Sequence, residues 1–78
     1  MTNLEKYTNA FASTFDIKPE EAAGLKYQGI EAWDSVGHMG LVAAIEEAFG
    51  IMMEADDIVD LSSFEKGREI LKKYSIEM

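Results

Sequence analysis

Ser35 is the residue of this chain whose type and surroundings could do chemistry. Asp34 precedes it, Val36 follows it, and His38 lies three positions further on. On a helix this offset places Ser35 and His38 one turn apart, so a hydroxyl nucleophile and an imidazole base can be imagined. No orienting acid or oxyanion donor can be identified to complete such a group. We therefore expect no intrinsic catalysis, and we expect His38 to be an exposed helix residue.

The same serine is well placed to carry an anionic group. Large apolar residues recur after it every three or four positions and predict a helix, with one apolar face formed by Val36, Met39, Val42, Ile45 and Phe49. Asp34 or Ser35 can cap the start of this helix, and Gly50 suits its end. A phosphodiester on the Ser35 hydroxyl would lie near free backbone amides and the positive end of the helix dipole. This position permits attachment but does not require it, because many helices begin with Asp or Ser and carry nothing.

The segments before the serine predict one helix and one long loop. A helix from Asn3 to about Phe15 follows from apolar residues at helical spacing, with its aromatic side chains in the core and Thr2 or Asn3 as its cap. Pro19 can begin a short helical turn. Residues 22–32 show no sustained period and predict a long connection fixed to the core, after which Trp33 buries its ring and sets the height of Ser35.

The segments after Gly50 predict a short helix and a final longer one. The short helix covers about Ala55 to Val59, and Met53, Ile58 and Leu61 face inward. The last helix starts from a capping box of Ser62 and Glu65 and ends in a solvated basic cluster. Its inner line is formed by Phe64, Gly67 or Arg68, Ile70 or Leu71, and Tyr74.

A calcium loop is not expected in the acidic stretch from Glu54 to Glu65. Ile58 falls where an oxygen ligand is needed and Val59 falls where the sharp turn needs glycine. With no cysteine and a single histidine, we expect no metal site elsewhere. The fold class predicted is all-α: a four-helix bundle of three main helices and one short helix, with a long loop between the first two.

Length and charge limit the classes of function. The 78 residues make one domain, 1–78, with a small core, and no apolar run is long enough to span a bilayer. The net charge is −8, and residues 27–65 hold nine acids and no lysine or arginine. Such a field repels nucleic acid and anionic lipid, and it speeds encounter with basic partners. We expect a soluble, cytoplasmic monomer that binds no nucleic acid and does not insert into membranes.

The stretch from Trp33 to Ile51 resembles the attachment region of acyl carrier proteins. The matching motifs are Asp34-Ser35-Val36 and the helix end Ile45-Glu46-Glu47-Ala48-Phe49-Gly50-Ile51. The similarity extends over nearly the whole chain, from about Leu4 to Tyr74. It implies an acyl-carrier-like four-helix bundle whose second helix begins at a modified serine and whose interior can receive an acyl chain.

The resemblance also implies a cofactor and partners. A phosphopantetheinyl transferase would attach 4′-phosphopantetheine from coenzyme A to Ser35, beside Asp34 and Val36, and the arm's thiol would hold an acyl or aminoacyl group as a thioester. Met39, Glu46 and Glu47 correspond to positions that partners commonly contact. The partners implied are the transferase, an acyl- or aminoacyl-loading enzyme, and a downstream synthase or transferase.

Three departures from the carriers of primary fatty acid biosynthesis favour a dedicated pathway. Gly37 and Gly40 replace polar or acidic residues, and Trp33 replaces a small one. Candidate cargoes belong to polyketide biosynthesis, to modified sugars or lipids, or to aminoacyl transfer. The alternative from another class is a non-enzymatic acidic interaction domain in which Ser35 is only a helix cap.

Overall fold

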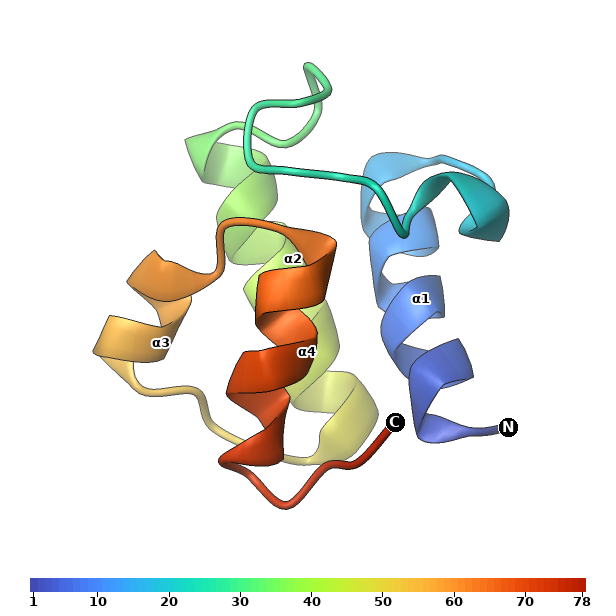
Figure 1. Ribbon diagram of the computed structural model, residues 1–78. Coiled ribbons are helices and arrows are strands. Elements are labelled where there is room, and N and C mark those ends of the chain that lie inside the picture. The colour runs from blue at the N-terminus through green and yellow to red at the C-terminus, as the bar shows by residue number, and fades with distance from the viewer.

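The computed structural model describes residues 1–78, which form an all-helical bundle without strands (Figure 1). Its four α-helices and one 3₁₀ turn are α1 (Asn3–Phe15), η1 (Pro19–Glu21), α2 (Ser35–Phe49), α3 (Ala55–Asp60) and α4 (Phe64–Lys72). The long connection between η1 and α2 crosses one end of the bundle (Figure 1). The prediction of an all-α bundle with three longer helices and one short helix is confirmed.

Local sequence signals fix the ends of the first two long helices. Thr2 caps α1 in a capping box with Glu5, in which each side chain accepts from the other residue's backbone amide. At the far end of α2, Gly50 adopts φ 64°, and its amide donates to the Glu46 carbonyl. A residue with a side chain is strained at that φ, so glycine is well suited to end the helix there.

Aromatic rings fill the centre of the bundle. Phe11 lies 5.0 Å from Tyr7, 5.4 Å from Trp33 and 5.1 Å from Phe64, measured between ring centroids. Phe15 stacks on Trp33 at 5.4 Å. All five rings are buried. The predicted burial of Trp33 is therefore confirmed, and its indole joins the last residue of the loop to α1.

α1 and α4 approach each other closely at one point. The buried Tyr7 hydroxyl donates a 2.7 Å hydrogen bond to the Phe64 carbonyl, and burial raises the pKa of Tyr7 far above its usual range. A Cβ atom at Gly67 would overlap this hydroxyl and crowd Leu61. Glycine at position 67 therefore allows the two helices to approach, although it lowers the intrinsic stability of α4.

The long loop is fixed to the connection between α3 and α4. The Tyr27 amide donates to the Ser62 carbonyl at 2.8 Å, and the Phe64 amide donates to the Leu25 carbonyl at 2.9 Å. Ala22 is buried, and the side chains of Leu25 and Ile30 pack against the core. The prediction that this loop is held to the core is confirmed, and the loop in turn sets where α2 begins.

The start of α4 differs from the sequence prediction by one residue. Ser63, not Ser62, is the N-cap, and its hydroxyl accepts from the Lys66 amide at 3.0 Å. The third helical residue is therefore Lys66, so the predicted box with Glu65 does not form. Glu65 instead faces Arg68 at 3.5 Å. The shift arises because the Phe64 amide is held by the loop, which keeps Ser62 in the connection.

The basic end of α4 is not simply solvated, as the sequence suggested. Lys73 Nζ lies 2.5 Å from Asp57 Oδ1, and the Tyr74 hydroxyl donates to Asp57 Oδ2 at 2.6 Å. Tyr74 also accepts from the Glu54 amide at 2.9 Å, although it lies beyond the last residue of α4. Asp57 is only 2% exposed, and these contacts lower its pKa, with Lys73 the larger cause. This cluster ties α3 to the end of α4.

Candidate functional site

Ser35 is the first residue of α2, and Asp34 is the residue that caps the helix. The Asp34 carboxylate accepts from the Gly37 amide at 2.8 Å, and its carbonyl accepts from the His38 amide at the same distance. The Ser35 side chain is exposed and is not needed as a cap. The sequence left the choice between these two residues open, and the structure assigns the cap to Asp34.

Because Asp34 and not Ser35 caps the helix, backbone amides near the Ser35 hydroxyl are left without an acceptor. The amides of the first two helical residues, Ser35 and Val36, have no acceptor within a helix, because their partners would lie before its start. The amide of Gly37 is already held by Asp34. An anion bonded to Ser35 Oγ would therefore meet two unpaired donors and the positive end of a helix of 15 residues.

Gly37 lets the chain fold back closely just before the serine. A Cβ atom at this position would overlap the Ala32 carbonyl oxygen and come within 3.2 Å of the Phe15 ring. Gly40 has no such restriction, because its nearest neighbour would be a Thr14 methyl at 3.6 Å. Of the two glycines that weaken α2, only Gly37 is required by its surroundings.

His38 is not the exposed residue that the sequence predicted. It is half-buried, and the Trp33 indole N–H donates to its Nδ1 at 2.9 Å. Since Nδ1 accepts, the ring proton of the neutral imidazole lies on Nε2, which donates to the Ile58 carbonyl at 2.7 Å. Both ring nitrogens are therefore engaged, and neither is available to take a proton from Ser35.

A mostly apolar pocket of about 460 Å³ opens beside Ser35. Its walls come from α2, α3, the long loop and the connection before α4: Ser35, His38, Met39, Ile58, Val59, Tyr27, Leu61 and Ser62. Sequence reasoning placed Ser35 and Met39 near the site but missed Tyr27 and the residues of α3. The apolar residues of the acidic α3 segment were the available signal, but their position beside Ser35 depends on tertiary packing.

The apolar residues at the start of α2 divide between surface and core. Val36 is 81% exposed and Met39 is 55% exposed, whereas Val42 and Ile45 on the same predicted stripe are buried. Leu41, which lies outside that stripe, is fully buried. Val59 of α3 is 80% exposed on the rim of the pocket. The stripe therefore continues from the core onto the surface around Ser35.

The two acids predicted to contact partners have different surroundings. Glu46 is half-buried, and its carboxylate accepts from the Met53 amide at 2.9 Å, which holds the chain after α2. Glu47 is exposed and lines a groove between α1 and α2 that Lys6 also lines. Met39, in contrast, lines the pocket beside Ser35. The three residues do not form one continuous cluster.

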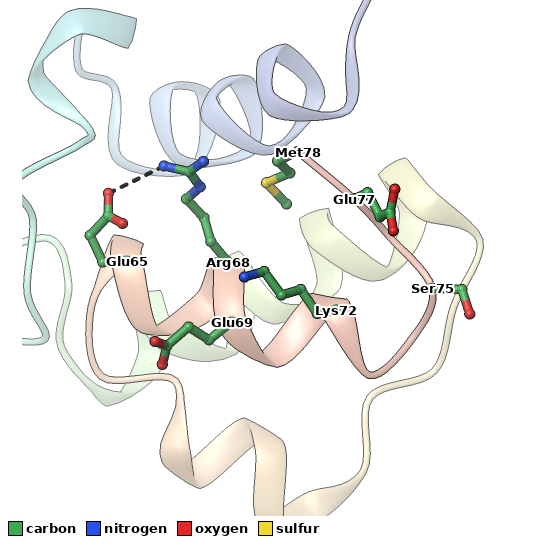
Figure 2. Close-up of a pocket in the computed structure, with 7 residues that line it drawn as sticks. All are labelled: Glu65, Arg68, Glu69, Lys72, Ser75, Glu77 and Met78. Atoms are coloured by element: carbon green, nitrogen blue, oxygen red, sulfur yellow. Dashed lines mark hydrogen bonds and ion pairs between the residues drawn. The ribbon is translucent and has the colours of Figure 1, made fainter.

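A larger hollow of about 800 Å³ lies away from this site, along α4 and the C-terminal segment (Figure 2). Its lining is dominated by charged side chains of both signs, and Arg68 within it faces Glu65 (Figure 2). None of the motif residues lines it. The pocket beside Ser35 is smaller but combines an exposed hydroxyl, free amides and apolar walls, so it is the better candidate site.

Comparison of the chain with protein-family models, curated proteins and solved structures finds no match. None of the helices combines the length and apolar character that crossing a bilayer requires. The motif around Ser35 and the geometry of its surroundings are therefore the features that bear on function.

Proposed function

We propose that the whole chain is an acyl carrier protein that bears 4′-phosphopantetheine on Ser35. The observation that carries the proposal is the exposed Ser35 hydroxyl at the start of α2, where Asp34 has taken over the role of cap. A serine that was only a cap would direct its oxygen to a backbone amide of the first turn. This serine is left free within a stretch, residues 33–51, that resembles the carrier motif.

The residues around Ser35 fit the phosphate of such an arm. The amides of Ser35 and Val36 supply donors, and the dipole of α2 favours the negative charge. The apolar pocket bounded by Met39 and Ile58 could hold the less polar part of the arm. When bound, the group supplies a thiol that carries acyl or aminoacyl cargo as a thioester, which this cysteine-free chain does not provide itself.

Attachment is the transfer of the phosphopantetheinyl group of coenzyme A to Ser35, catalysed by a partner enzyme with magnesium. The bond that forms joins Ser35 Oγ to phosphorus, and the bond that breaks is the pyrophosphate bond of coenzyme A. Adenosine bisphosphate leaves, and the hydroxyl proton passes to the transferase. His38 takes no part, because both of its ring nitrogens are engaged within the fold. The chain is thus a substrate of its partners and not an enzyme.

The surface around Ser35 suits brief contacts with several enzymes. Exposed apolar side chains, Val36, Met39 and Val59, lie near the serine. The central part of the chain, residues 27–65, carries nine acids and no lysine or arginine. Charges of one sign speed the encounter with oppositely charged partners without making binding tight. A carrier needs such brief contacts because it visits a transferase, a loading enzyme and a synthase in turn. We propose a monomeric, cytoplasmic carrier of a dedicated biosynthetic pathway.

Intact-mass measurement tests the proposal directly. The apo protein is incubated with coenzyme A, magnesium and a transferase of broad specificity, alongside a known carrier. We expect the mass of one phosphopantetheinyl group to be added to the wild type and to Ser13→Ala, which removes an exposed serine of α1. We expect no addition to Ser35→Ala.

Two results would overturn the proposal. One is the absence of any addition to the wild type while the known carrier is modified, which would leave an acidic interaction domain as the better interpretation. The other is an addition that persists in Ser35→Ala, which would place the attachment on another residue.

A further inference from the structure

Two residues that line the pocket beside Ser35, His38 and Ile58, belong to a chain of two hydrogen bonds that begins at Trp33, and we call this chain the seal. The Trp33 indole N–H donates to His38 Nδ1, and His38 Nε2–H donates to the Ile58 carbonyl. The first bond joins α2 to the end of the long loop, and the second joins α2 to α3. The His38 ring lies nearly in the plane of the Trp33 ring, with 13° between the two planes and centroids 6.2 Å apart, and it meets the Tyr27 ring edge to face at 5.4 Å.

The aromatic rings beyond His38 are buried and packed against one another. Trp33 is fully buried and lies against Phe11 and Phe15, with both centroid distances 5.4 Å. None of the four pockets of the molecule is lined by any of these three rings. Close-packed interiors of this kind admit extra groups only if side chains move.

We infer that the Trp33–His38–Ile58 seal makes this chain a carrier of short or polar acyl cargo, which stays at the surface and is not enclosed in the bundle. The inference rests on the proposed function. Moving a long alkyl chain from water into an apolar cavity lowers its free energy, so a carrier of such chains benefits from an interior that can open. Here entry would break two hydrogen bonds and displace the central indole. Trp33 and His38 are thus positioning residues that determine which cargo suits the carrier.

Acyl groups of different length, attached by the transferase from acetyl-, octanoyl- and hexadecanoyl-coenzyme A, test the inference. Because a ligand that binds inside the folded state stabilises it, an enclosed chain would raise the melting temperature with its length. For the wild type we expect the three melting temperatures to agree within about 2 °C. The chain has one tryptophan, so its single indole N–H signal in proton–nitrogen NMR spectra reports on the seal. We expect that signal to be the same in the three forms.

Two variants open the seal in different ways. His38→Ala removes both hydrogen bonds, and Trp33→Leu removes the first bond together with part of the buried side-chain volume. We expect the octanoyl or hexadecanoyl form of either variant to melt about 4 °C or more above its acetyl form. In His38→Ala the indole signal should also move with chain length. The second variant keeps the test conclusive if the first does not fold.

The matched control is Ile70→Ala, which removes a buried side chain of α4 that is not part of the seal. It should lower the three melting temperatures equally. A wild type whose melting temperature and indole signal follow chain length overturns the inference, and so do two folded variants that gain no dependence on length. A wild type that accepts no acyl-phosphopantetheinyl mass at all overturns the proposed function itself, which is a separate result.

Discussion

Gly37 lies so close to Ala32 that a side-chain carbon at position 37 would overlap the Ala32 carbonyl oxygen. The backbone just before Ser35 therefore folds against the first turn of α2, and only glycine fits there. The contact explains why a helix that begins at the candidate attachment site tolerates a residue that weakens helices.

Alanine substitutions at the two glycines of α2 should have opposite effects on stability. Gly40→Ala meets only a methyl group at 3.6 Å, so the gain in helix propensity should raise stability by about 1 kcal/mol. Gly37→Ala gains the same propensity but must displace backbone, and it should lower the melting temperature. Thermal unfolding followed by circular dichroism measures both. A stabilised Gly37→Ala would show that the close approach to Ala32 is not required.

Alanine substitutions at Asp34 and Ser35 should show that Asp34 caps α2 and that Ser35 does not. Asp34→Ala removes the acceptor of the Gly37 amide and should cost about 1 kcal/mol of folding free energy. Ser35→Ala should change that free energy by less than about 0.5 kcal/mol, because the hydroxyl is exposed and is not the cap. Urea unfolding of the two variants checks this. Equal losses would return Ser35 to the role of a cap.

Asp57 should make the fold sensitive to acid. Its contacts with Lys73 and Tyr74 lower its pKa in the folded state, so its contribution is present above the unfolded value, about 3.9, and is lost as the pH falls through the folded value. Asp57→Asn should be less stable at neutral pH and should show a flatter loss of stability below about pH 4. Urea midpoints measured across pH test this. A variant with the same acid dependence as the wild type would contradict it.

Lys73 should contribute at the opposite end of the pH scale. Its hydrogen bond to Asp57 raises its pKa in the folded state. The contribution is therefore present below the unfolded value, about 10.4, and is lost as the pH rises through the folded value. Lys73→Met should remove part of the alkaline loss of stability, which urea midpoints measured at rising alkaline pH would show. An alkaline loss equal to that of the wild type would contradict this. The hydrogen bond to Asp57 also raises the pKa of Tyr74, so Tyr74 contributes stability that is lost in the same direction. This contribution remains in Lys73→Met, which is why only part of the alkaline loss should disappear.

Glu46 and Glu47 should differ in what they do for the fold. Glu46→Ala removes the acceptor of the Met53 amide and should destabilise the protein, whereas Glu47→Ala should not. Glu46→Gln keeps an acceptor oxygen and loses only the charge. If these acids guide docking, Glu46→Gln and Glu47→Gln should each be loaded by the transferase roughly two- to fivefold more slowly at low ionic strength, with unchanged melting temperatures. Unchanged loading rates would remove both residues from the docking surface.

The sequence by itself determined the class of fold and the position of the serine. Periodic apolar residues predicted the helices, and α1 matches the predicted range from Asn3 to Phe15. Local signals, such as Gly50 after α2 and Pro19 at a short turn, were sufficient because they act through neighbouring backbone groups. The motif around Ser35 depends only on adjacent residues, so it was also visible in the sequence.

Only the tertiary structure decided which side chains meet. His38 appeared exposed because helical spacing says nothing of Trp33 or of the Ile58 carbonyl, 20 residues away. The buried role of Asp57 depends on Lys73 and Tyr74 in the same way. The cap of α4 is Ser63 and not Ser62 because the loop holds the Ser62 carbonyl and the Phe64 amide. Contacts between distant segments depend on how the helices pack, and residue spacing along one helix does not contain that information.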